Sequence, residues 1–324
     1  MKRSMLIGTG SYVPHKILTN DELSKIVDTN DSWIIERTGI KQRHIAGDNE
    51  LTSDMATLAL RAALENSHLN PQDLDGIILA TTTPDVVFPA SAVRVQQKLG
   101  LRQGFAFDLN AVCTGFVYAL TIADTMLMAK TNLRRIAVIG AETMSRIVNW
   151  QDRSTCILFG DGAGAVILES CDLSDKATNI GIIDSDLQSD GSFWDILKVD
   201  GGTAKGNFSA KIEMKGREVF KNAIDKVVTH ALHLLQRCGV APAEIDWLLP
   251  HQANYRMMQS LAQRIGIAPE KIISSLDKHA NTSGASIPLA LDTYIRQNIV
   301  KKGELILMVA MGGGLTWGSI LIRI

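Results

Sequence analysis

A cysteine, a histidine and an asparagine lie in three separate segments that could together support acyl transfer. Cys113 stands in the segment 110–116, between a strand-like run at 105–109 and an apolar helical run at 117–128. At such a strand-to-helix turn, the unpaired helix amides and the positive end of the helix dipole favour thiolate over thiol. The position predicts a nucleophile that needs no metal, although an arbitrary cysteine is more often a small buried core residue.

The other two polar residues follow elements that can converge on the same crevice. His251 comes directly after a strand-like run at 246–250, and Asn281 lies in a polar loop before the helical run 287–298. Beside a thiolate, these side chains could hydrogen-bond around a thioester oxygen. The glycine triplet within segment 311–318 lets backbone amides approach a substrate, so one of them could pair with the Cys113 amide as an oxyanion hole.

Strand-like and helical runs alternate along the chain, which predicts an α/β fold with largely parallel, covered sheets. Amphipathic helical patterns cover 53–65 and 217–236, with apolar residues three and four apart. The glycine-rich segment 159–165 leads into a strand rather than opening a helix, so it does not fit a dinucleotide-binding loop. The expected strands are 5–7, 76–81, 105–109, 135–139, 163–169, 247–249, 304–310 and 319–324.

The second half of the chain repeats the first. Segment 70–79 resembles segment 241–250, and segment 135–140 resembles segment 304–309 at nearly the same offset along the chain. Segment 164–168 has a counterpart at 318–322. We therefore expect halves at 1–172 and 173–324, with a boundary near 170–176. Because ligand sites in α/β sheets lie beyond the carboxyl ends of strands, the functional site should lie between the halves.

Composition excludes several classes of protein. The 324 residues are 46% hydrophobic and 21% charged with a formal net charge of −1, which argues against a dedicated nucleic-acid binder. The four cysteines have no paired spacing and the seven histidines are scattered, so we expect neither disulfides nor a metal site. The apolar run 5–7 is too short for a signal peptide, and no apolar run has the length of a membrane span. A cytoplasmic protein is expected.

Several of these segments resemble one enzyme family. The Cys113 segment, Pro-His-Gln-Ala-Asn at 250–254, segment 279–283, the glycines of 312–318, segment 159–164 and Trp-Ile-Ile-Glu-Arg-Thr-Gly-Ile at 33–40 are similar to those of thiolase-fold condensing enzymes, most closely β-ketoacyl-acyl-carrier-protein synthase III. The resemblance implies two duplicated halves stacked as a layered αβαβα sandwich. It also implies a Cys/His/Asn set, where elongating synthases have Cys/His/His.

The resemblance implies a two-step reaction without a cofactor, in which a coenzyme A thioester is the substrate. Cys113 would take the acyl group from acyl-CoA, most simply acetyl-CoA, with the amides of Cys113 and Gly313 as the oxyanion hole. Malonyl-acyl-carrier protein would then lose CO₂, while His251 and Asn281 donate hydrogen bonds to the enolate oxygen. Attack on the acyl group would give 3-ketoacyl-carrier protein. Two neutral donors suit this step, because a general acid would quench the carbanion.

The resemblance also implies binding roles and a homodimer. Trp33 would stack on the adenine of coenzyme A. The loop 84–89 would carry Phe88 to the acyl pocket of the second subunit. The other coenzyme A contacts would be Arg37, Arg153, Gly216, Phe220 and Asn254, the acyl pocket would include Met311, and Lys221 and Arg256 would meet the acidic carrier protein.

The chain departs from the family pattern at three positions. Met311 and Leu315 stand where aromatic residues are common, and Ala280 replaces a glycine before Asn281. Methionine is flexible and fills irregular space, so we expect the floor of the pocket to admit an acyl group other than acetyl. Three other interpretations remain open: a related synthase that uses longer acyl-CoA or malonyl-CoA for a secondary metabolite, a non-catalytic carrier-protein scaffold, and a cysteine hydrolase.

Overall fold

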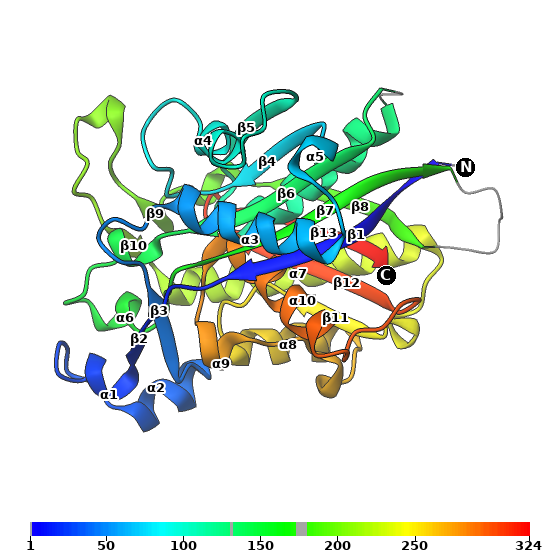
Figure 1. Ribbon diagram of the computed structural model, residues 1–324. Coiled ribbons are helices and arrows are strands. Elements are labelled where there is room, and N and C mark those ends of the chain that lie inside the picture. The colour runs from blue at the N-terminus through cyan, green and yellow to red at the C-terminus, as the bar shows by residue number, and fades with distance from the viewer. Residues whose placement is uncertain (1, 130–131, 173–179) are drawn as a thin grey trace.

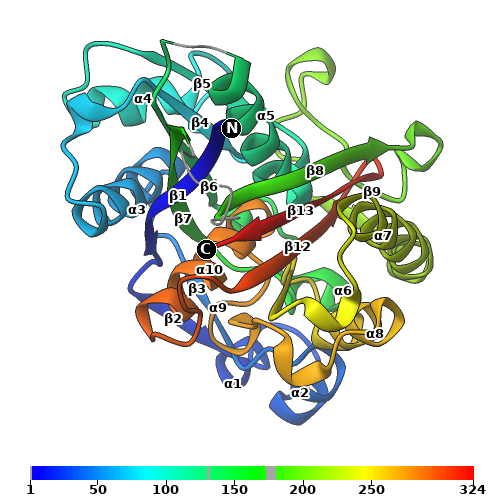
Figure 2. The same ribbon diagram turned by 90° about the vertical axis from the view of Figure 1, so that its right-hand side faces the viewer.

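The chain folds around two mixed β-sheets (Figures 1 and 2). The structure is a computed structural model that describes residues 2–129, 132–172 and 180–324. The first sheet has the strand order β1-β7-β6-β4-β5, in which β4 is parallel to β5 and β6, while β7 is antiparallel to β6 and β1. Its strands are β1 (Lys2–Tyr12), β4 (Gly76–Ala80), β5 (Phe105–Leu109), β6 (Arg135–Glu142) and β7 (Gly162–Asp172).

The second sheet has the same pattern with one strand fewer. Its order is β11-β12-β13-β8, with β11 parallel to β12 and the other pairs antiparallel. Its strands are β8 (Gly181–Ser189), β11 (Trp247–Pro250), β12 (Leu305–Gly312) and β13 (Thr316–Arg323). In sequence order, β11, β12 and β13 correspond to β4, β6 and β7, as the repeated segments predict.

Helices cover the outer faces of both sheets and fill the space between them. The strand β4 is apolar on both faces and therefore needs a helix on each side. Ile77 and Leu79 pack with α3 (Thr52–Asn66) on one face, and Ile78 packs with α5 (Gly115–Ala129) on the other. The helices α5 and α10 (Ser286–Arg296) lie between the sheets, and α7 (Gly216–Cys238) and α8 (Tyr255–Ile265) cover the outer face of the second sheet (Figure 2). The predicted αβαβα sandwich is confirmed.

The remaining elements surround one end of the sandwich and shape the mouth of the site. A two-stranded ribbon joins β2 (Lys16–Thr19) to β3 (Gln42–Ile45), and another joins β9 (Leu197–Val199) to β10 (Ile212–Met214). The other helices are α1 (Asn20–Leu23), α2 (Asp31–Thr38), α4 (Ser91–Lys98), α6 (Arg153–Cys156) and α9 (Leu276–His279).

Local sequence explains where the helices next to the site begin and end. The Asn254 side chain accepts the Arg256 amide at the start of α8, and Gly266 ends this helix in the left-handed conformation. Gly239 ends α7 in the same way. These two stops turn the chain back toward the second sheet, so that β11 begins a few residues after α7.

Two expectations from the sequence are wrong, and part of a third lies outside the described residues. The sheets are mixed rather than largely parallel, in part because only three residues separate β12 from β13, and such a connection allows only an antiparallel pair. The expectation that no apolar run has the length of a membrane span is also wrong, because the window Val112–Ala129 has this length and composition. Half of this window is buried inside the molecule, and its helix α5 packs between the sheets. The predicted boundary near 170–176 falls partly on residues 173–179, outside the described residues, so that the halves 1–172 and 173–324 stay a prediction.

Candidate active site

Cys113 lies in a strained turn between a strand and a buried helix. The chain leaves β5, forms the short 3₁₀ turn η2 (Val112–Thr114) and enters α5. Val112 has φ of 51°, a region that a β-branched residue rarely adopts. Gly312, at the end of β12 in the second half of the chain, packs tightly against this turn. A Cβ atom on Gly312 would lie only 2.9 Å from the Cys113 amide nitrogen. The close approach of the two backbones therefore needs glycine at this position.

The Cys113 side chain is a buried thiol. Burial is the main cause that raises its pKa to about 12; the nearby Glu142 carboxylate acts in the same direction, and a hydrogen bond from Sγ to the Ser283 hydroxyl (3.5 Å) acts against it. The predicted effect of the helix N-terminus, which favours the thiolate, is thus opposed by desolvation of the buried sulfur. Desolvation outweighs the dipole, and the thiol must lose its proton as it reacts.

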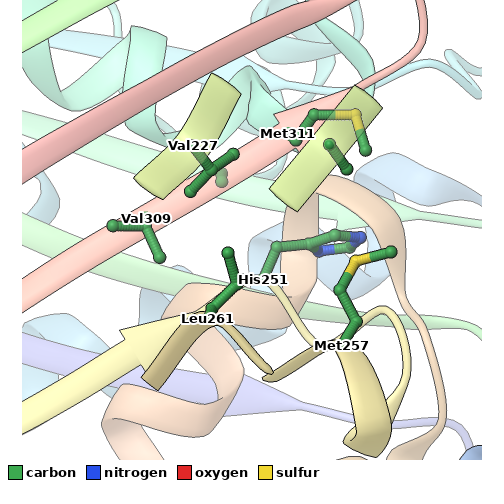
Figure 3. A pocket seen from close by; sticks show the side chains of 8 residues that line it. Val227, His251, Met257, Leu261, Val309 and Met311 are labelled. Atoms are coloured by element: carbon green, nitrogen blue, oxygen red, sulfur yellow. The ribbon is translucent and has the colours of Figure 1, made fainter. Parts of the chain in front are cut away.

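His251 lies in an apolar pocket directly after β11. Figure 3 shows its ring between Met257 and Met311, next to a small cavity of about 20 Å³. Burial lowers the pKa of His251 to about 4, so the ring is neutral at pH 7. Its Nδ1 lies 2.7 Å from the Ser286 hydroxyl, which also accepts the Gln252 amide at 3.3 Å. If the Ser286 hydroxyl donates its proton to Nδ1, the ring hydrogen of the neutral His251 lies on Nε2, and Nε2 can then donate a hydrogen bond.

Asn281 is held by its backbone and by one side-chain oxygen. Its amide donates to the Leu158 carbonyl, its carbonyl accepts from Gly160, and Oδ1 accepts the Ser283 amide at 2.8 Å. No partner of its side-chain NH₂ is seen among the described residues, so this group can donate a hydrogen bond to a ligand. Ala280, just before it, has φ of 58° and ψ of −160°, a conformation that normally requires glycine.

One cavity brings the three predicted catalytic residues together. Its volume is about 660 Å³, and Cys113, His251 and Asn281 all line it. The walls come from both halves of the chain, as the duplication predicts. Its lining also includes Trp33, Arg37, Gly216, Phe220, Asn254, Arg256 and Met311 from the predicted set.

A second cavity of about 430 Å³ is lined by Cys113 and by the residues of β9. Cys113, Phe159 and Leu197 line both cavities, so the two cavities adjoin at Cys113. Neither residue predicted for the acyl pocket lines this second cavity: Met311 lines the first one, and Phe88 is 83% exposed. The sequence interpretation missed its lining residues, which include Thr82, Asn110, Met144, Ile147 and Ile212.

The predicted nucleotide contacts gather around Trp33 at the mouth. The guanidinium carbons of Arg37 and Arg153 lie 4.6 and 4.8 Å from the centroid of the Trp33 ring. Arg153 also donates to the Asp28 carbonyl at 2.9 Å. Because Arg153 lies directly over the indole, an adenine ring between the two needs this guanidinium to move outward.

The remaining predicted residues differ in their placement. Asn254 Nδ2 donates to the Arg37 carbonyl (3.0 Å), and Arg256 bonds to the Glu36 carbonyl (3.1 Å), so both tie α8 to α2. Lys221 is exposed on α7 next to Phe220 and lines neither cavity. Gly313 also lines neither cavity and packs on the Leu197 carbonyl. The roles of all these residues stay predictions.

Glu142 and Ser283 are buried polar residues beside Cys113 that the sequence interpretation missed. Glu142 ends β6, and Ser283 begins the 3₁₀ turn η8 (Ser283–Ala285). A signal was present, because Val112 and Ser283 are separated by the same offset as the repeated segments 70–79 and 241–250. Val112 and Ser283 also both have positive φ, 51° and 49°, so η2 and η8 are equivalent turns of the two halves.

Three comparisons place the chain among known proteins. Residues 107–191 and 235–324 match family models described as 3-oxoacyl-[acyl-carrier-protein] synthase III and its C-terminal part. Proteins named beta-ketoacyl-[acyl-carrier-protein] synthase III are 52% identical in Ehrlichia canis and 49% in Wolbachia pipientis, over the whole of each chain.

Solved structures of similar enzymes have the same fold as this chain. A 3-oxoacyl-[acyl-carrier-protein] synthase III of Aquifex aeolicus is 45% identical with a TM-score of 0.92, covering 99% of this chain and 100% of that one. The priming β-ketosynthase of the R1128 polyketide biosynthetic pathway is 32% identical with a TM-score of 0.93, covering 99% and 96%.

Proposed function

This chain belongs to the 3-oxoacyl-[acyl-carrier-protein] synthase III family, and we propose that it condenses an acyl-CoA primer, acetyl-CoA, with malonyl-acyl-carrier protein. The products are 3-ketoacyl-carrier protein, CO₂ and coenzyme A. The reaction starts fatty acid synthesis, and the enzyme is an acyltransferase.

The observation that carries the proposal is the position of Cys113 between two cavities. The larger cavity reaches the surface beside Trp33 and Arg37, where an aromatic ring and a guanidinium suit a nucleotide. The smaller cavity accepts an acyl chain beyond the sulfur. A thioester placed along this path brings its carbonyl carbon to the thiol.

In the first half-reaction, Cys113 attacks the thioester carbonyl. The C–S bond to coenzyme A breaks, and an acyl-enzyme forms on Cys113. The proposed oxyanion hole consists of the amides of Cys113 and Gly313. Coenzyme A is here a substrate, and the proposal requires no cofactor.

In the second half-reaction, His251 and Asn281 hydrogen-bond the thioester oxygen of the malonyl group. Loss of CO₂ leaves an enolate whose charge these two donors stabilise. Both are neutral, since the His251 pKa is about 4, so neither quenches the carbanion with an acidic proton. The carbanion then attacks the acyl carbon and releases Cys113.

Product analysis tests the proposed function. Acetyl-CoA and longer acyl-CoA are each incubated with malonyl-carrier protein or with malonyl-CoA, and the carbon–carbon bonded product is measured. Condensation with acetyl-CoA and malonyl-carrier protein supports the proposal. Preference for malonyl-CoA or a long acyl-CoA indicates a secondary-metabolite synthase, and hydrolysis alone indicates a cysteine hydrolase.

Covalent labelling tests the nucleophile separately. Radiolabelled acetyl-CoA should label the protein, and Cys113→Ser should abolish the label. Persistent labelling of this variant excludes Cys113 as the acyl acceptor. A wild type without label and without condensation is a carrier-protein scaffold.

The proposal includes a homodimer in the cytoplasm, where coenzyme A thioesters are made. The edge of the first sheet supports the dimer, because β5 pairs with β4 on one side only, and its Phe105 and Phe107 are only partly buried. Next to it, the loop of Val86, Val87 and Phe88 exposes three apolar side chains. An exposed apolar strand edge of this kind needs a cover.

Acidic carrier protein is the proposed partner at the mouth. Arg256 and Lys221 are exposed there, and Arg217 lines the same cavity. Opposite charges on the two proteins steer the encounter and raise the association rate more than the final affinity.

A further inference from the structure

The His251 ring is held at one of its nitrogens by a buried hydroxyl. Nδ1 lies 2.7 Å from Oγ of Ser286, which is the first residue of α10 and is 2% exposed. The backbone amide of Gln252 donates to the same Oγ at 3.3 Å. The His251 backbone is fixed separately, because its amide donates to the Val309 carbonyl of β12 at 2.8 Å. The position of the ring therefore depends on a hydroxyl from a different helix.

The neighbours of this hydroxyl decide where its proton points. A serine oxygen has one hydrogen to donate and two lone pairs that accept. The Gln252 amide occupies one lone pair, and within the described part of the chain Nδ1 is the only acceptor for the Ser286 hydrogen. A hydrogen on Nδ1 would leave the Ser286 hydrogen buried without an acceptor, which is unfavourable. The Ser286 hydroxyl therefore donates to Nδ1, and the single hydrogen of the neutral ring lies on Nε2.

Nε2 is the ring nitrogen that can meet the substrate. It has no partner among the residues that the structure describes, and His251 lines the same cavity as Cys113 and Asn281. Figure 3 shows the ring between Met257 and Met311, whose thioethers are only weak acceptors. The hydrogen on Nε2 is thus available to an oxygen of a bound thioester.

Asn281 is oriented in the same way by the same segment of the chain. Its Oδ1 accepts the amide of Ser283, three residues before Ser286. In both side chains the accepting atom is occupied by the protein and the donating atom remains for a ligand. Two donors suit an enolate oxygen, whereas a hydrogen on Nδ1 would turn the lone pair of Nε2 toward that oxygen.

We propose that Ser286 is a positioning residue that makes His251 a donor to the enolate oxygen by fixing the ring hydrogen on Nε2. The proposal rests on the proposed function and deepens it. Ser286 lines neither the large cavity nor the second one, so it acts through the imidazole and not on the substrate. Its hydroxyl occupies the lone pair of Nδ1 and holds the plane of the ring, and no proton leaves it during the reaction.

Nitrogen NMR tests the tautomer without any substrate. The protein is labelled with nitrogen-15 histidine, and the His251 signals are those that disappear in His251→Gln. We expect the N–H correlations of the Nε2–H tautomer in the wild type at pH 7 and a mixture of both tautomers in Ser286→Ala. An Nδ1–H tautomer in the wild type would overturn the proposal, and so would a Ser286→Ala variant that keeps only the Nε2–H tautomer.

Kinetics test the consequence for the reaction. In Ser286→Ala, kcat for CO₂ release from malonyl-carrier protein should fall about 10- to 100-fold, which is less than the loss of a whole oxyanion donor. Acylation of Cys113 by labelled acetyl-CoA should stay within twofold of the wild type, because His251 acts in the second step. Equal losses in the two steps, or CO₂ release within twofold of the wild type, would overturn the proposal.

Ser319→Ala is the matched control. Ser319 is also a buried serine, and its hydroxyl lies 3.1 Å from Nδ1 of a buried histidine, His230, but neither residue lines the two cavities at Cys113. This variant should release CO₂ within twofold of the wild-type rate. A loss equal to that of Ser286→Ala would indicate a general effect of packing and overturn the proposal. If the wild type releases no CO₂, the proposed function fails, while the NMR spectra still decide the role of Ser286.

Discussion

The reactive side chains of this protein are neutral because they are buried. Burial raises the pKa of Cys113 and lowers that of His251, so neither group is charged at pH 7. A site of this kind suits a carbanion, which a nearby cationic acid would protonate. It also means that the Cys113 thiol must lose its proton as it reacts.

His251→Ala separates the two half-reactions. Condensation should fall by 10²- to 10³-fold, about the loss of one oxyanion donor, whereas acylation of Cys113 should change by less than about tenfold. Labelled acetyl-CoA measures the first step and CO₂ release from malonyl-carrier protein measures the second. An equal loss in both steps would contradict the assignment of His251 as a donor for the enolate.

The low pKa of His251 predicts a loss of stability in acid. The unfolded histidine binds a proton below pH 6.5 and the folded one only below about pH 4, so stability is lost as the pH falls through this window. At pH 4.5 the cost is about 3 kcal/mol. Urea unfolding at pH 7 and 4.5 should show a smaller drop for His251→Gln than for the wild type, and equal drops would contradict the prediction.

Ala280 is strained, and glycine should relieve the strain. Ala280→Gly should raise the free energy of unfolding by about 1 kcal/mol, since relief of φ 58° exceeds the added entropy of the unfolded chain. The control is Ala285→Gly, where φ is −80° and glycine should destabilise. Urea titration measures both, and a destabilised Ala280→Gly would contradict the argument.

At the scale of elements, the mouth of the site depends on the contact between α2 and α8. Asn254 and Arg256, at the start of α8, both bond to the last turn of α2, whose Trp33 and Arg37 line the cavity. The two helices come from different halves of the chain. Their contact therefore joins the two halves at the mouth of the cavity.

Arg256→Glu tests the carrier-protein surface. The KM for malonyl-carrier protein should rise about tenfold, because a rim charge acts mainly on association, and acylation by acetyl-CoA should fall by less than this. The matched control is Arg264→Glu on the same helix, where Arg264 pairs with Asp225. Equal KM values for Arg256→Glu and the wild type would exclude this surface.

At the scale of the molecule, the two sheets pack through α5 and α10 and bring their strand ends together. Turns η2 and η8 meet at this junction, so one half supplies Cys113 and Glu142 and the other supplies Ser283, His251 and Asn281. The site exists only when both halves are packed. The first sheet has two edge strands, β1 and β5, and β5 is the one next to the exposed apolar loop of Val86, Val87 and Phe88.

Phe107→Lys tests the proposed dimer through this edge. Sedimentation of the wild type should give twice the chain mass of 35.3 kDa, and the variant should shift toward the single chain, because a lysine on a strand edge opposes pairing. Ile26→Lys, an exposed apolar residue on another part of the surface, should remain a dimer. A wild type that sediments as a monomer would contradict the proposal.

Much of this arrangement was predictable because it depends on local patterns. Alternating apolar runs predict the strands and helices, and the internal repeat at a nearly constant offset predicts two similar sheets. The order strand, turn, helix around Cys113 is likewise visible in the chain. The antiparallel pairs were not predicted, since apolar periodicity does not record the direction of a neighbouring strand.

The sequence by itself determined the family motifs, the alternation of elements and the residues Cys113, His251 and Asn281. Only the tertiary structure decided the protonation state of these side chains and the residues that surround them. Whether Cys113 is a thiol or a thiolate depends on desolvation, and desolvation depends on what packs over the sulfur. Cys113 and Ser283 lie far apart in the chain, and only the packing of the two halves brings the thiol within 3.5 Å of the Ser283 hydroxyl.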